Sequence, residues 1–264
     1  MIEFLNKLLS RVNLKLVSVE PTKTKTSFTK GELEEYYRCS KDPIYFINTY
    51  VKCYIFSGKI DLKLLPYQEY MVNLFQDTKF SLVNSTRQSG KSLIPSLYLL
   101  HQLVFTDNAD IGIMSHNTNA SKHCLQLIRD CYNNLPNFLK QKVKTSTDSE
   151  FSVENGSKIR VATKFTINHG FTHIFLNEFA CFEYYTASEI MYILMPYFSL
   201  PGNKKIIITS TKRKNSYFNE LVENPGAFKT FGINWTDIPG RDEKWKEDMI
   251  SNIGEDAFEE QFVV

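Results

Sequence analysis

In the middle of the chain, short apolar runs alternate with longer segments whose apolar residues recur every three to four positions. The apolar runs are Phe80 to Asn84, Ile111 to Met114, Ile174 to Asn177 and Ile206 to Ser210. After the first run, Leu93, Leu97, Leu100 and Val104 form an apolar stripe on one face of a helix. Strands that alternate with such helices are typical of a mostly parallel sheet. The pattern therefore predicts an α/β fold with flanking helices.

A different pattern interrupts this alternation between the second and third runs. The apolar segments 151–153 and 158–162 flank the dipeptide Asn155-Gly156. Such a dipeptide is the strongest short signal for a tight hairpin turn. We therefore expect one antiparallel insertion in the otherwise parallel sheet.

The N-terminal quarter of the chain contains helix-start signals. Residues 22–26 alternate Thr and Lys without an apolar period, which predicts a linker. Thr29 followed by Glu32 is a capping box that opens a helix, and the Asp42-Pro43 pair opens a second helix. Two helices are therefore expected before the sheet begins.

The pattern changes again after Ser210. A strand is expected at 228–235, and charged helices are expected at 242–262. We interpret this part as a small lid subdomain. The predicted organisation is an N-terminal segment and linker at 1–28, a core at 29–212 and a lid at 213–264.

The composition is that of an ordinary globular protein, and it excludes few functional classes. A hydrophobic fraction of 42% and a charged fraction of 23% are ordinary for a globular protein. No window approaches the roughly 18 uninterrupted apolar residues that a membrane span needs. The net charge of +2 is too small to indicate a nucleic-acid partner by itself. The five cysteines lack metal-site spacing, so we expect small buried hydrophobes in a reducing compartment.

A candidate phosphate-binding loop, or Walker A motif, lies between the first apolar run and the helix that follows it. Its residues are Ser85, Thr86, Arg87, Gln88, Ser89, Gly90, Lys91 and Ser92. In such a loop Lys91 reaches the β and γ oxygens of a nucleotide, and the Ser92 hydroxyl binds magnesium. Ser85 stands where the motif usually has its first glycine. The alternative is an ordinary strand-to-helix turn that contains Gly-Lys-Ser.

A second chemical signal lies where the third apolar run ends. Glu178 is suited to orient and deprotonate a water molecule that attacks the γ-phosphate. Asn177 occupies the place where nucleotide hydrolases usually have a magnesium-binding aspartate. An amide there can accept a hydrogen bond from a metal-bound water, but it supplies no negative charge. The alternative is a strand that simply ends in a surface Asn-Glu pair.

The fourth apolar run ends in three hydroxyl residues, Thr209, Ser210 and Thr211. In motors with this kind of sheet, such a strand end can sense the γ-phosphate and relay its loss to the next subdomain. The same run is equally well explained as a core strand that reaches a loop. The adjoining Lys212, Arg213 and Lys214 are either a phosphate-contacting patch or a solvated basic loop.

Taken together, these motifs resemble the large terminase subunit of tailed bacteriophages. Arg87 and Gln88 are the unusual matches, because generic nucleotide hydrolases lack them. Gln68, in Pro66-Tyr67-Gln68, resembles the family's adenine-contacting glutamine. Asn177 and Glu178 fall where the family has Asp-Glu, and residues 209–211 fall on its coupling motif. The resemblance spans about residues 40 to 264.

The resemblance implies a RecA-like P-loop ATPase that uses ATP and Mg²⁺ to move double-stranded DNA into a capsid. Lys91 and Arg87 would stabilise the transferring phosphoryl group, Glu178 would activate water, and Ser92 with Asn177 would hold the metal. The implied partners are the portal protein, the small terminase subunit, a nuclease domain of the same enzyme and other subunits of a ring. The implied location is the host cytoplasm, transiently at the procapsid portal. We expect neither a nuclease domain in this chain nor a membrane partner.

Two other functions share some of these motifs. A helicase-like remodelling ATPase also combines a glutamine motif, a phosphate loop and a coupling motif. A non-hydrolysing nucleotide-binding scaffold would explain Asn177 as a decayed site. The family often has an Arg-Gly pair where this chain has His169-Gly170, so Arg129 and Arg160 are candidates for an arginine offered to a neighbouring subunit.

Overall fold

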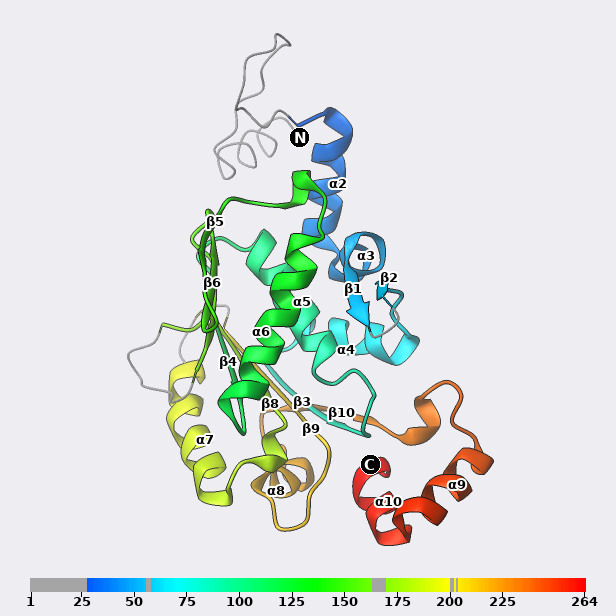
Figure 1. Ribbon diagram of the computed structural model, residues 1–264. Coiled ribbons are helices and arrows are strands. Elements are labelled where there is room, and N and C mark those ends of the chain that lie inside the picture. The colour runs from blue at the N-terminus through cyan, green and yellow to red at the C-terminus, as the bar shows by residue number, and fades with distance from the viewer. Residues whose placement is uncertain (1–27, 56–57, 163–169, 200–201, 203) are drawn as a thin grey trace.

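An eight-stranded sheet forms the centre of the computed structural model, which describes residues 28–55, 58–162, 170–199, 202 and 204–264 (Figure 1). The strands in spatial order are β10 (Lys229–Ile233), β3 (Phe80–Ser85), β9 (Lys205–Ser210), β8 (His173–Asn177), β4 (Asp110–Ser115), β7 (Lys158–Val161), β6 (Glu150–Val153) and β5 (Val143–Ser146). Neighbours from β10 to β7 are parallel, and β6 and β5 continue the sheet in antiparallel pairs. The predicted α/β class and the antiparallel insertion are therefore confirmed.

Helices cover both faces of the sheet, because successive strand residues point to opposite faces. On one face α4 (Pro66–Asp77), α5 (Leu93–Phe105) and α6 (Thr118–Asn133) belong to a core with Val83 and Ile207. On the other face α7 (Tyr184–Ser199) and α8 (Tyr217–Glu223) belong to a core with Leu82 and Ile208. Figure 1 shows these two layers of helices on opposite sides of the strands. The fold is thus a three-layer α/β arrangement.

The N-terminal helices begin where the capping signals predict. α2 (Lys30–Lys41) has the Thr29 capping box, and α3 (Pro43–Tyr50) begins after Asp42, whose side chain accepts a hydrogen bond from Tyr45 N. An antiparallel hairpin of β1 (Lys52–Ile55) and β2 (Gly58–Asp61) follows, which the sequence pattern did not predict. The linker expected at 22–26 lies outside the described residues.

The C-terminal segment begins in the central sheet and then leaves it. β10 pairs in parallel with β3, so the strand that we assigned to the lid forms one edge of the main sheet. The short helix η3 (Trp235–Asp237) and the helices α9 (Glu243–Ile253) and α10 (Glu255–Phe262) follow. Their aromatic side chains form a separate apolar cluster of Trp235, Phe258 and Phe262. The division at residue 212 remains a proposal.

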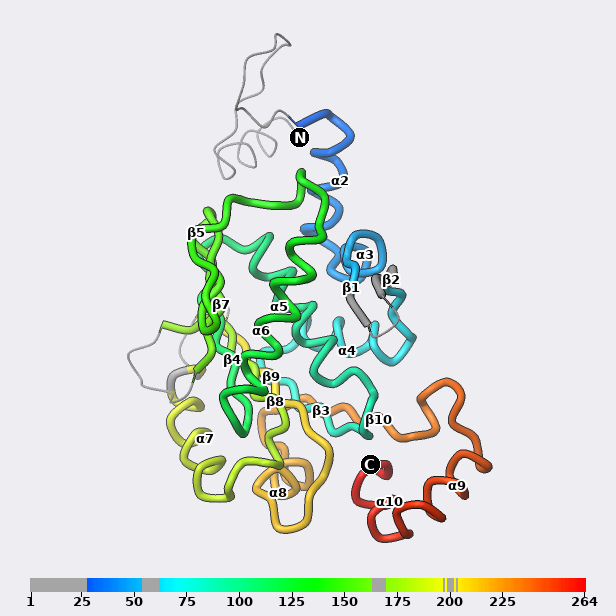
Figure 2. Tube along the Cα trace, viewed as in Figure 1, coloured from blue at the N-terminus to red at the C-terminus, as the bar shows by residue number. Residues whose placement is uncertain are grey.

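The chain returns at its C-terminal end to the carboxyl edge of the sheet. Figure 2 shows the C-terminus beside the end of β10. A Cβ added at Gly232 would lie 3.0 Å from Cγ1 of Val264, so the two residues are packed against each other. The remaining short helices are η1 (Asn137–Leu139) and η2 (Phe179–Cys181).

Four of the cysteines are buried, as the sequence predicts, and Cys181 is half-buried. All five are free thiols. Within the described ranges, no helix has both the length and the apolar character that crossing a membrane requires.

Candidate nucleotide site

The candidate phosphate loop lies at the carboxyl end of β3, between β10 and β9. α5 begins at Leu93, directly after the loop. Pro95 falls in the first turn of this helix, where backbone N–H groups have no helical partner, so its missing donor costs nothing. Two loop residues have left-handed backbone angles, Gln88 with φ 62° and Gly90 with φ 89°. A Cβ at Gly90 would lie 3.0 Å from the Gln68 amide nitrogen, which explains why this turn carries a glycine.

Lys91 and Glu178 meet across this edge of the sheet. Lys91 Nζ lies 3.1 Å from Glu178 Oε1, and the two side chains are 9% and 27% exposed. Glu178 follows β8 with a left-handed φ of 55°, which is strained for a residue with a side chain. Strained backbone that persists at the end of a buried strand is typical of functional sites. The lysine and the carboxylate that the sequence singled out therefore share one site.

Ser92 and Asn177 form the second contact of the site. Ser92 Oγ donates to Asn177 Oδ1 at 2.8 Å, and Asn177 Nδ2 donates to Ser115 Oγ at 3.2 Å. The second bond follows from the parallel register of β4 and β8, which pairs Ser115 with Asn177. Asn177 is 4% exposed, so its amide lies inside the site rather than on the surface.

The oxygen atoms at this contact suit a hard cation. Mg²⁺ prefers oxygen ligands and usually takes only one or two from the protein, with phosphate and water completing its shell. Ser92 Oγ matches that requirement as a direct ligand, and Asn177 Oδ1 could accept a hydrogen bond from a metal-bound water. The described residues contain no cluster of three His, Cys, Asp or Glu side chains that would form a self-sufficient metal site. Magnesium bound here would therefore depend on a phosphate ligand.

Buried polar atoms without a hydrogen-bond partner gather around the same edge. Among the described residues, six of the ten such side-chain atoms belong to Asn84, Ser85, Ser89, Thr209 and Thr211. A buried hydroxyl or amide without a partner costs about 1–3 kcal/mol, so each one needs an explanation. A polar ligand bound at the loop would supply that explanation for the hydroxyls of Ser85, Ser89 and Thr209.

Gln68 lies behind the loop, at the first turn of α4. Its Oε1 accepts from Leu65 N at 3.0 Å, and its Nε2 lies 3.4 Å from Ser89 O. The Tyr67 hydroxyl donates to the same Ser89 carbonyl at 3.1 Å. Both side chains thus contact the loop backbone, which places them beside the site. Adenine contact by Gln68 stays a prediction.

The hydroxyl residues at the end of β9 contact two different parts of the site. Thr209 lies in register with Asn177 of β8. Ser210 Oγ accepts from Ala180 N at 2.9 Å, and Ala180 is two residues after Glu178. The end of β9 is therefore bonded to the turn that carries Glu178. This geometry is suitable for coupling, which also stays a prediction.

The two arginines considered for a neighbouring subunit have different surroundings. Arg160 Nη2 binds both oxygens of Asp110, at 2.8 and 2.7 Å, so it has a structural ion pair. Arg129 is on α6 and donates to the Thr147 carbonyl and to Gln126 Oε1. The basic residues 212–214 lie on the loop that follows β9, with Arg213 and Lys214 exposed.

Sequence reasoning missed one group at the site, Arg241. Its guanidinium donates to Thr86 Oγ1 at 3.2 Å and to Arg87 O at 2.9 Å. The α10 carbonyl of Gln261 accepts from Arg87 N at 3.1 Å. Nothing in the local pattern around residue 241 marks this contact, because the partners are more than 150 residues apart in the chain.

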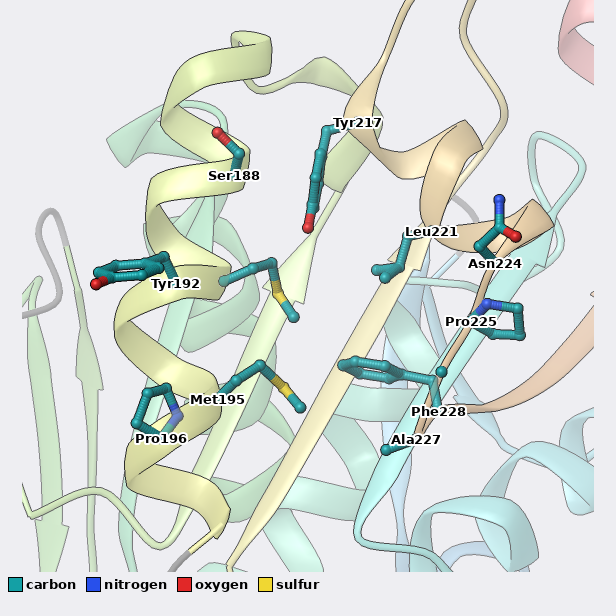
Figure 3. Close-up of a pocket in the computed structure, with 12 residues that line it drawn as sticks. Ser188, Tyr192, Met195, Pro196, Tyr217, Leu221, Asn224, Pro225, Ala227 and Phe228 are labelled. Atoms are coloured by element: carbon teal, nitrogen blue, oxygen red, sulfur yellow. The ribbon is translucent and has the colours of Figure 1, made fainter.

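An apolar pocket of about 500 Å³ lies on the other helical face, between α7, α8 and the segment 224–228 (Figure 3). Met195, Tyr217, Leu221 and Phe228 extend into the space between these elements. None of the predicted site residues lines this pocket. It is therefore separate from the candidate nucleotide site.

No protein-family model matches the chain. Among solved structures, it is similar to the large terminase ATPase domain of Thermus phage P74-26, with 15% identity, a TM-score of 0.55, and coverage of 70% of this chain and 88% of that one. It is similar to the large terminase of bacteriophage HK97, with 16% identity, a TM-score of 0.61, and coverage of 80% and 47%. It is also similar to the large terminase of a thermophilic bacteriophage in complex with ATP-gamma-S, with 12% identity, a TM-score of 0.55, and coverage of 75% and 51%.

These similarities concern the fold. The chain has the α/β, RecA-like P-loop fold of the large terminase ATPase domains, as the motifs predicted. It spans about half the length of the HK97 terminase and of the terminase in complex with ATP-gamma-S.

Proposed function

We propose that this chain is the ATP-hydrolysing motor domain of a DNA-packaging terminase. The observation that carries the proposal is the meeting of Lys91 with Glu178 and of Ser92 with Asn177 at the end of the phosphate-loop strand. A phosphate-binding cation, a general base and a metal-binding hydroxyl are the groups that ATP hydrolysis needs. The fold shared with large terminase ATPase domains supports the same assignment.

The proposed chemistry assigns one task to each side chain. Lys91 would bind the β and γ oxygens of ATP, and its 3.1 Å contact with Glu178 supports a role for this carboxylate beside the γ-phosphate. Glu178 orients that water and accepts its proton, and Arg87 in the loop stabilises the transferring group. Ser92, with Asn177 behind it, would hold Mg²⁺, which would neutralise phosphate charge. Gln68 contacts adenine.

Coupling would begin at the bond between Ser210 Oγ and Ala180 N. A change in position of Glu178 when the γ-phosphate leaves would move this turn and, through it, the end of β9. Thr209, Ser210 and Thr211 would transmit that movement toward the loop at 212–214. The proposed cycle thus links ATP hydrolysis to a movement of the basic loop at 212–214, which follows β9.

The wider assignment rests on the family resemblance. The proposed substrate of the motor is double-stranded DNA, and the proposed partners are the portal protein, the small terminase subunit, a nuclease domain and neighbouring copies in a ring. The proposed location is the host cytoplasm, with transient attachment to the procapsid portal. Residues 29–212 would act as the ATPase core, completed by β10 at the edge of its sheet, and the rest of residues 213–264 would act as the lid.

A packaging assay tests this function. Purified procapsids with portal, linear double-stranded DNA and Mg-ATP are mixed with the protein, and DNA protected from added nuclease is measured. We expect protection with the wild type and none with Glu178→Gln. ATP turnover without DNA protection, but with unwinding of a duplex, would favour the helicase-like alternative. Nucleotide binding without turnover would favour a scaffold in which Asn177 marks a decayed site.

A further inference from the structure

Arg241 joins the C-terminal segment to the phosphate loop. It lies between η3 and α9, and its guanidinium contacts three consecutive loop residues. Nη1 donates to Thr86 Oγ1 at 3.2 Å, and Nη2 donates to Arg87 O at 2.9 Å and lies 3.5 Å from Gln88 Oε1. A guanidinium presents its donors in a fixed fork, so it can hold several acceptors in one geometry.

Aromatic rings hold the guanidinium in place. Its central carbon lies 4.6 Å from the Trp245 ring centre and 5.4 Å from the Phe262 ring centre. These rings pack with Trp235 and Phe258 in the apolar cluster of the C-terminal segment. The orientation of Arg241 is therefore set by a packed cluster rather than by the loop alone.

The loop contains a backbone conformation that needs such support. Gln88 has a φ of 62°, in the left-handed region that residues with side chains rarely adopt. A strained conformation of this kind persists only where its surroundings hold it. The carbonyl of Arg87, which Arg241 binds, belongs to the same planar peptide as the N–H of Gln88.

That shared peptide plane has a directional consequence. In a trans peptide the C=O and N–H bonds point in opposite directions. Because Arg241 holds the Arg87 carbonyl, the Gln88 N–H points away from the C-terminal segment. Backbone N–H groups of a turn can form an anion-binding concavity, and the Gln88 N–H is the loop N–H that this contact orients.

Backbone bonds fix the preceding residues from the same side. Thr86 N donates to Ile233 O of β10 at 2.9 Å, and Arg87 N donates to Gln261 O of α10 at 3.1 Å. The main chain from 86 to 88 is thus held by the segment that begins at β10. Among these contacts from the C-terminal segment, those of Arg241 come from a side chain. Arg241 can therefore be substituted without directly altering the backbone hydrogen bonds.

We propose that Arg241 is a positioning residue for the phosphate loop, which holds the Arg87–Gln88 peptide in the orientation that phosphate binding requires. The inference rests on the proposed function, because it concerns the affinity of the same loop for nucleotide. It follows that nucleotide affinity depends on whether the segment 234–264 is docked against the loop.

The test is a pair of substitutions in the full chain, with Mg-ATP as the probe. Arg241→Ala should raise the Kd from calorimetry and the KM for Mg-ATP about tenfold or more, with kcat within about threefold, since charge-assisted bonds to the loop are lost while Lys91 and Glu178 stay. Adding Gln88→Gly should recover at least about half of that loss on a logarithmic scale, because glycine adopts positive φ without strain.

Matched variants separate this role from a general loss of stability. Arg38 stacks on the Tyr45 ring at 3.6 Å, far along the chain from the loop, and Arg38→Ala should leave the Kd within about twofold. Arg241→Lys keeps the charge and the stem but not the fork, so it should fold and give an intermediate loss of affinity.

Two outcomes would overturn the inference while sparing the proposed function. One is an unchanged Kd in both Arg241 variants. The other is a loss in Arg241→Ala that Gln88→Gly does not reduce, which would mean that Arg241 acts elsewhere than on this peptide. A wild-type chain that fails to bind Mg-ATP would overturn the proposed function and this inference together, so the two failures are distinguishable.

Discussion

The two edges of the central sheet both bury polar side chains, but they differ in what satisfies those groups. At the amino edge, the Lys205 ammonium donates to Gln76 O at 2.7 Å and to Thr78 O at 2.9 Å. At the carboxyl edge, the hydroxyls of Ser85, Ser89 and Thr209 have no partner within the described part of the chain.

The difference distinguishes buried polar groups that stabilise the fold from buried polar groups that are available to a ligand. A buried ammonium that donates hydrogen bonds to the carbonyls at the end of a helix stabilises the folded state. Unpaired hydroxyls next to a lysine and a glutamate keep their hydrogen-bonding capacity for a ligand. Exceptions near the amino edge include the Tyr98 hydroxyl and the Nε2 atom of the neighbouring His173 ring, which also have no partner among the described residues. This imidazole is buried and neutral, because burial lowers its pKa to about 3.

The largest expected effect comes from the lysine of the carboxyl edge. Lys91→Ala should raise the Kd for Mg-ATP at least about a hundredfold, because Lys91 would contribute two charge-assisted bonds of about 1.5–3 kcal/mol each. Calorimetric titration measures the affinity, and a urea midpoint checks the fold. An unchanged affinity for Mg-ATP would show that the loop at 85–92 does not bind the nucleotide.

Lys205→Met provides the matched control at the amino edge. This substitution leaves two helix-end carbonyls without their donor, so it should lower the free energy of unfolding by about 1–3 kcal/mol. Its affinity for Mg-ATP should match that of the wild type. A loss of Mg-ATP affinity in Lys205→Met together with unchanged affinity in Lys91→Ala would contradict the distinction between the edges.

A smaller effect is expected from Asn177→Asp. A carboxylate beside the magnesium adds an attraction of which about 1–3 kcal/mol should survive screening, or roughly 5- to 150-fold in Mg-ATP affinity or turnover. Affinity for metal-free nucleotide should stay the same or weaken slightly through charge repulsion. Magnesium titrations of turnover in the two proteins test this, and superimposable curves would show that Asn177 has no part in metal binding.

The smallest effect concerns pH and the amino edge. His173 is charged in the unfolded chain below its ordinary pKa of about 6.5, whereas burial keeps it neutral in the fold down to about pH 3. The contribution of neutral His173 to the free energy of unfolding is therefore fully present above pH 6.5 and is lost as the pH falls toward 3. The contribution to the slope is at most about 1.4 kcal/mol per pH unit.

His173→Leu should remove that part of the slope. Urea unfolding between pH 6.5 and 4.5 measures it, with His123→Leu on the exposed face of α6 as the control. Part of the slope should remain, since burial also lowers the pKa of His101, to about 4. ATP turnover at neutral pH should not change in either variant. An identical slope in His173→Leu and the wild type would contradict the assignment.

Local patterns predicted most of the sheet and the position of the loop between a strand and a helix. The apolar runs that became β3, β4, β8 and β9 have the short length that is typical of buried strands. The loop at 85–92 was recognisable because its strand-loop-helix context is continuous in sequence. The sequence assigned Lys91 and Glu178 separate roles, and their 3.1 Å contact became visible only in the structure, where the carboxyl ends of parallel strands share an edge.

What the sequence could not supply is the long-range pairing. β10 was expected as a strand, but its place beside β3 depends on contacts almost 150 residues apart, for which no local signal exists. The contact between Arg241 and Thr86 spans 155 residues and has the same origin. The hairpin at 52–61 was missed because its two strands are four residues each and lack a strong turn signal.

The most direct test of the central claim is the turnover of Mg-ATP by the wild type and by Glu178→Gln. The carboxylate at the end of β8 is assigned as the general base, and its neutral isostere keeps the shape of the site. We expect slow but measurable hydrolysis by the wild type, and turnover lower by about 100-fold or more in Glu178→Gln. Affinity for Mg-ATP should agree within about threefold between the two proteins. Equal turnover in both would contradict the account.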